Sequence, residues 1–70
     1  MNAAPAPAPA AETVAELTAG IAALSAHLEL PDHNAPGRPG WQQRNATLLA
    51  YIEATYATRL RVALAREATA

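Results

Sequence analysis

The stretch PDHNAPGRPG, residues 31–40, decides the fold because it interrupts two helical patterns that lie on either side of it. It contains three prolines and two glycines. Proline lacks an amide donor and disfavours the α region for the residue before it, and glycine favours turns. The sequence therefore predicts two helices joined by a loop over residues 30–40.

The segment before the loop has the pattern of an amphipathic helix over about residues 13–29. Thr13 and Glu16 have capping-box spacing, in which the hydroxyl accepts from the N3 amide and the carboxylate reaches back. Large apolar residues then recur at intervals of three and four, which places them on one narrow face, at Val14, Leu17, Ile21, Leu24 and Leu28. The flanking alanines are small enough to let a second helix approach closely, and Gly20 either marks a tight crossing or is simply tolerated.

The segment after the loop predicts a longer helix over about residues 41–67, because nothing inside it breaks a helix. Its large apolar residues follow helical spacing from Leu49 onward, with Tyr51 and Val62 beside the main stripe, which consists of Trp41, Leu48, Leu49, Ile52, Tyr56, Leu60 and Leu64. At 1.5 Å per residue, the two helices would be about 27 Å and about 40 Å long.

The predicted fold class is all-α, an antiparallel hairpin of two helices spanning residues 12–69. Antiparallel packing would bring the acidic start of the first helix, with Glu12 and Glu16, beside the basic end of the second, with Arg59, Arg61 and Arg66. The Ala-Pro repeat within residues 1–11 favours polyproline II over helix, so a disordered tail is expected there.

Composition argues against several kinds of site. The chain of 70 residues has no cysteine, so it forms one domain at most and has no disulfide to support a small core. His27 and His33 are too few ligands for a zinc site without thiolates, and no metal or cofactor is expected. Neither histidine has a nucleophile or second acid at a meaningful spacing, so no catalytic residue is expected and the chain is predicted not to be an enzyme.

Charge and hydropathy argue against two classes of partner. The net charge of -1 and the pI near 6.0 are unlike those of nucleic-acid-binding domains. No run reaches the roughly 18 apolar residues that a membrane span needs, and the N-terminus lacks the pattern of a secretory signal. These features predict a cytoplasmic protein that binds neither nucleic acid nor membrane.

Two thin helices cannot enclose each other's apolar faces, so part of the longer helix is expected to stay accessible. The candidates for this exposure are Trp41, Tyr51, Tyr56, Leu60, Val62 and Leu64. Exposed apolar patches mark binding surfaces, and Trp, Tyr and Arg are enriched at binding hot spots. The chain is therefore predicted to be a protein-interaction module for a helical partner. The predicted partner-binding residues are Trp41, Leu49, Ile52, Tyr56, Arg59, Leu60 and Leu64. Two alternatives are a self-assembling helical dimer and a docking domain of a larger multienzyme system.

The segment Trp41-Gln42-Gln43-Arg44, followed by Leu48 and Ile52, opens the second predicted helix after a glycine-containing breaker. This arrangement resembles the small hairpin chaperones of bacterial type III secretion, whose second helix often opens with an aromatic residue and glutamine. The resemblance covers residues 12–64 in architecture, although the loop here is longer. It implies a cytosolic co-chaperone that, with a larger helical-repeat chaperone, keeps the needle subunit from polymerising early. The apolar helical face would then meet the partner chaperone.

Overall fold

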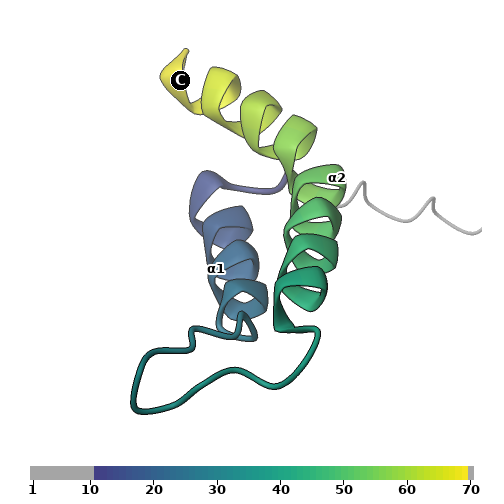
Figure 1. Ribbon diagram of the computed structural model, residues 1–70. Helices are drawn as coiled ribbons and strands as arrows, with labels where there is room; N and C mark the ends of the chain where they lie inside the picture. Colours follow the sequence, from purple (N-terminus) through teal and green to yellow (C-terminus); the bar gives the residue numbers. More distant parts are fainter. Residues whose placement is uncertain (1–10, 70) are drawn as a thin grey trace, which may run out of the picture.

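The computed structural model describes residues 11–69 as two helices, α1 over Val14–Ser25 and α2 over Trp41–Ala68. The helices run antiparallel and contact each other, and residues 11–69 contain no strand (Figure 1). The predicted all-α hairpin is confirmed. The disordered tail predicted for residues 1–11 lies, except for Ala11, outside the described residues.

The start of α1 has the hydroxyl half of the predicted capping box, without a bond from the Thr13 amide back to the Glu16 carboxylate. The Thr13 Oγ1 atom accepts a hydrogen bond from the Glu16 amide at 3.1 Å, and Thr13 itself has extended backbone with φ −92° and ψ 159°. This bond satisfies one of the amides that have no partner in the first turn of a helix. The N-terminal boundary was therefore readable from the sequence to within one residue.

The end of α1 comes earlier than the predicted residue 29. After Ser25, the amides of His27 and Leu28 bond to carbonyls three residues back, which tightens the chain into a turn. The side chain of Asn45 then bonds both backbone groups of Glu29, accepting from its amide at 2.9 Å and donating to its carbonyl at 2.8 Å. A side chain from α2 thus replaces the hydrogen-bond partners that Glu29 would have within a longer α1.

The start of α2 depends on Gly40, which has φ 84° and ψ 7°. This left-handed conformation is costly for a residue with a Cβ atom, so glycine suits the position. No proline or glycine follows until the helix ends at Ala68, close to the predicted end at residue 67. The loop ends and α2 begins where the sequence predicts.

The core is small because α1 covers only part of α2. Among residues 11–69, three are buried, Leu17 from α1 and Ile52 and Ala63 from α2. With 12 and 28 residues, the helices are roughly 18 Å and roughly 42 Å long. The C-terminal part of α2 turns across the start of α1 (Figure 1). This places the basic end of α2 beside the acidic residue Glu12, which precedes α1. One face of α2 is therefore buried, and its other faces are open.

Gly20 leaves room for the ring of Tyr56 from α2. A Cβ atom added there would lie 2.5 Å from the Tyr56 hydroxyl oxygen and 3.0 Å from its Cζ atom. A real side chain at this position would displace the tyrosine ring. Of the two interpretations of Gly20, this contact with a side chain of α2 favours the tight crossing over a merely tolerated glycine.

Replacing Gly20 by leucine is expected to destabilise the hairpin by about 1–3 kcal/mol, because overpacking outweighs the better helix propensity of leucine. Ala22→Leu is the matched control: Ala22 is exposed on the same helix, so its change is expected to stay within about 0.5 kcal/mol. Urea unfolding followed by far-ultraviolet circular dichroism measures both. Equal effects of the two substitutions would contradict the close Gly20–Tyr56 approach.

Candidate partner-binding surface

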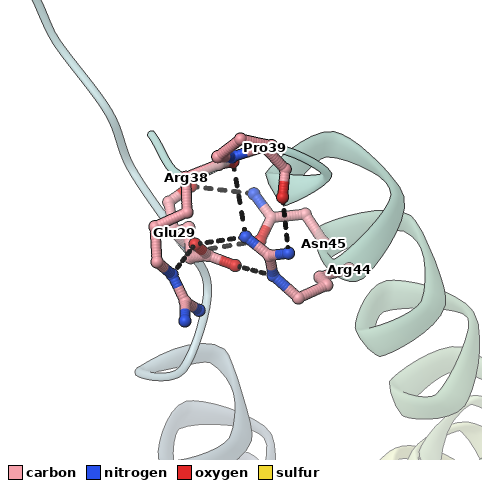
Figure 2. Close-up of polar contacts among 5 residues, drawn as sticks. All are labelled: Glu29, Arg38, Pro39, Arg44 and Asn45. Atoms are coloured by element: carbon pink, nitrogen blue, oxygen red, sulfur yellow. Dashed lines mark hydrogen bonds and ion pairs between the residues drawn. The ribbon is translucent and has the colours of Figure 1, made fainter. Parts of the chain in front are cut away.

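A polar cluster holds the loop against α2 (Figure 2). The Glu29 carboxylate accepts from Arg44 through Nε at 2.6 Å and Nη2 at 2.9 Å, and from the Nε atom of Arg38 at 3.3 Å. Arg44 also donates to the Pro39 carbonyl at 2.8 Å. These hydrogen bonds, that of Arg44 above all, lower the pKa of Glu29 from 4.5 to about 2. The cluster ties both ends of the loop to one helix turn.

A second polar cluster closes the opposite end of the hairpin. Glu12 forms a two-point ion pair with Arg59, in which the Nε and Oε2 atoms lie 3.0 Å apart. Arg66 donates to the Glu12 carbonyl at 3.1 Å, and the Glu67 carboxylate accepts from the Val14 amide at 2.6 Å. The bond from Arg59 lowers the pKa of Glu12. The predicted proximity of the acidic start and the basic end is confirmed through Glu12.

Four of the predicted binding residues make contacts within the hairpin. Ile52 is only 9% exposed and belongs to the core, so it is closed to a partner while α1 is in place. Tyr56 packs on Gly20, and the Arg59 guanidinium lies 5.0 Å from the Tyr56 ring centre while also pairing with Glu12. Trp41 is half-buried, and its ring packs against Gly37 of the loop. A Cβ atom added at Gly37 would lie only 2.5 Å from that ring.

The other three predicted residues share one side of α2. With about 3.6 residues per turn, Leu49, Leu60 and Leu64 fall on the same side of the buried line through Ile52 and Ala63. We call these three leucines the leucine flank. Leu49 is 52% exposed and Leu64 is 50% exposed, and Leu60 is half-buried between them. Leu49 and Leu64 are the most exposed apolar side chains of the predicted partner-binding set.

Further apolar surface lies on the other side of α2, outside the predicted set. Tyr51 and Val62 are each more than half exposed there. Tyr51 also borders an open hollow of about 440 Å³ with Leu48, Thr47, Arg44 and Gln43. The exposure of Tyr51 and Val62 agrees with the sequence, although neither was among the predicted partner-binding residues, whereas Leu30, 84% exposed in the loop, carries no periodic signal. Accessible apolar area therefore borders the buried stripe of α2 on both sides.

Other kinds of site have little support in the geometry. Within residues 11–69, no three His, Asp or Glu side chains gather closely enough to hold a metal ion. Neither α1 nor α2 combines the length and the apolar character that crossing a bilayer requires. Comparison with known proteins adds no relative, since no family model, curated protein or solved structure matches the chain. The case for function rests on the chain's own surface.

Glu29→Gln is expected to flatten the acid end of the stability profile. Because the folded pKa of about 2 lies below the ordinary 4.5, ionised Glu29 stabilises the hairpin fully above pH 4.5, and this contribution disappears as pH falls toward 2. The unfolding free energies of the parent and the variant should therefore differ at neutral pH and converge near pH 2. Urea unfolding at a series of pH values measures this convergence.

Arg44→Gln supplies the control for that experiment. Arg44 is the main cause of the lowered pKa, so Glu29→Gln should change the pH profile less in the Arg44→Gln background than in the parent. An identical profile for the parent and Glu29→Gln would show that the cluster does not stabilise the folded chain.

Proposed function

We propose that this chain is a helical protein-interaction module that binds a helical partner through the leucine flank. The observation that supports this most directly is the exposure of Leu49 and Leu64 on α2, next to a core of only three buried residues. Exposed leucine side chains are unfavourable in water, and a partner that covers them removes this cost. An apolar helical face is the natural occupant of such a stripe.

The polar clusters support the proposal by keeping the hairpin closed. Glu29 holds the loop, and Glu12 holds the end of α2, so α1 stays on the same face of the longer helix. The leucine flank is then presented on a supported helix, which reduces the ordering cost of binding. Trp41, Tyr56 and Arg59 act in this proposal as supports of the flank, because their described contacts are within the chain.

A narrower form of the proposal follows from the resemblance to type III secretion chaperones. In that form the chain is a bacterial cytoplasmic co-chaperone, and its partner is a larger helical-repeat chaperone or a needle subunit. The support for it is the Trp41–Arg44 segment together with the hairpin architecture. The broader proposal of a helical interaction module does not depend on it.

The experiment places a photo-crosslinking amino acid at position 64 in the full chain, expressed in its native cell. The same amino acid at position 18, exposed on α1, is the matched control. A specific partner should be captured from position 64 and not from position 18. Purified, that partner should bind Leu64→Ala roughly 30-fold more weakly than the parent, as expected for a hot-spot residue worth about 2 kcal/mol.

Helicity must be measured alongside binding. Leu64 lies outside the core, so Leu64→Ala should leave the far-ultraviolet circular dichroism and the urea midpoint close to those of the parent. Equal capture at both positions, or unchanged affinity of Leu64→Ala for the captured protein, would refute a binding role for the leucine flank.

A further inference from the structure

We propose that the helical partner of two members of the leucine flank, Leu60 and Leu64, is a second copy of this chain, paired antiparallel along α2. This inference rests on the proposed function and names its occupant. It comes from the side of α2 that begins beside the buried line at Leu60 and runs round to the face away from Ile52 and Ala63. With about 3.6 residues per turn, this side brings together two leucines, three alanines and two opposite charges, namely Ala50, Glu53, Ala54, Ala57, Leu60, Arg61 and Leu64.

The order of these residues is self-complementary. When two copies of α2 run antiparallel about a two-fold axis at Ala57, residues whose numbers sum to 114 lie opposite each other, because each is as far from the centre as the other. Leu60 then faces Ala54 of the second copy, and Leu64 faces Ala50. Each large side chain meets a small one, so the helices can approach closely without removing either leucine from the interface.

The charges specify the same register. Glu53 and Arg61 are both exposed, and neither forms an ion pair within residues 11–69; Arg61 donates to the hydroxyl of Thr58 at 3.1 Å. In the antiparallel register, Glu53 of each copy lies opposite Arg61 of the other, which gives two equivalent ion pairs. In a parallel dimer, Glu53 would face Glu53 of the second copy and Arg61 would face Arg61, so like charges would repel. Charge therefore selects the antiparallel arrangement over the parallel one.

The second copy can also reach this face without opening the hairpin. Of the seven residues on this side of α2, five are exposed in the single chain and two, Ala57 and Leu60, are half-buried. The two polar clusters that hold the ends together do not involve Glu53 or Arg61. Pairing would add a helix to each hairpin and give a four-helix assembly with α2 helices at its centre. It would cover Leu60 and Leu64 while the Gly20 crossing stays as it is in the single chain.

A charge exchange tests this register in the full chain. Glu53→Arg makes both facing positions positive, and Arg61→Glu makes both negative. Each variant alone is expected to dimerise at least about tenfold more weakly than the parent, since attraction is replaced by repulsion at both ends of the stripe. An equimolar mixture of the two variants should form a one-to-one dimer, because each copy then offers the charge that the other lacks.

Sedimentation equilibrium from about 10 µM to about 1 mM measures the association, and far-ultraviolet circular dichroism confirms that every variant folds. Thr18→Arg and Thr18→Glu, on the exposed side of α1, are the controls and should dimerise like the parent. The inference is overturned by a parent that stays monomeric throughout this range. It is also overturned by single variants that dimerise as the parent does, or by a mixture that fails to recover.

The two proposals fail separately. A monomeric parent whose crosslink at position 64 captures a different protein, with affinity that falls in Leu64→Ala, removes the second copy and keeps the interaction module. A parent that neither dimerises nor shows position-specific capture removes both. A dimer that the parent forms, that each single variant loses and that the mixture of the two variants regains establishes the antiparallel register.

Discussion

The coverage of a long helix by a short one is the constraint on which the rest of this structure depends. Residues Val14–Ser25 of α1 can bury one face along part of α2, which runs over Trp41–Ala68. Burial is proportional to the apolar area removed from water, so a short α1 limits how much of α2 can be stabilised in this way. The exposed leucine flank is a direct result of that difference in length.

Polar contacts at the two ends of the hairpin hold α1 in position along α2, which the small apolar core does not do by itself. Arg44 and Arg59 each use a planar guanidinium to bind a carboxylate at two points, a geometry that lysine cannot reproduce. The pairs are partly exposed, so each fixes position more than it adds stability. Together they set the register of α1 along α2, and through it the part of α2 that is covered.

The sequence was most informative where a local rule determines the structure. The cap at Thr13, the break over residues 31–40 and the uninterrupted second helix each depend on residues close to one another in the chain. Glu12 and Arg59 were placed correctly because antiparallel packing and opposite charge lead to the same arrangement. The early end of α1 was missed, because it depends on an amide side chain sixteen residues further along, that of Asn45.

The division of α2 into buried and exposed sides was also beyond a one-dimensional pattern. Ile52 and Leu49 are three residues apart and chemically alike, yet the first is in the core and the second is open. Which of them is covered depends on the rotation of α2 against α1. That rotation is fixed by the contact of Tyr56 with Gly20, and the hydrophobic period alone leaves it undetermined.

The packing of the Trp41 ring against Gly37 has a practical consequence for fluorescence spectroscopy. Trp41 is the single tryptophan, and it lies at the junction of loop and helix, more than two helical turns before Leu49 and further still from Leu64. Its fluorescence therefore reports on the packing of the junction. An emission spectrum that stays constant when a partner is titrated in does not show whether the partner has bound at the leucines. A fluorescent probe attached near the C-terminal half of α2 is the appropriate choice for that measurement.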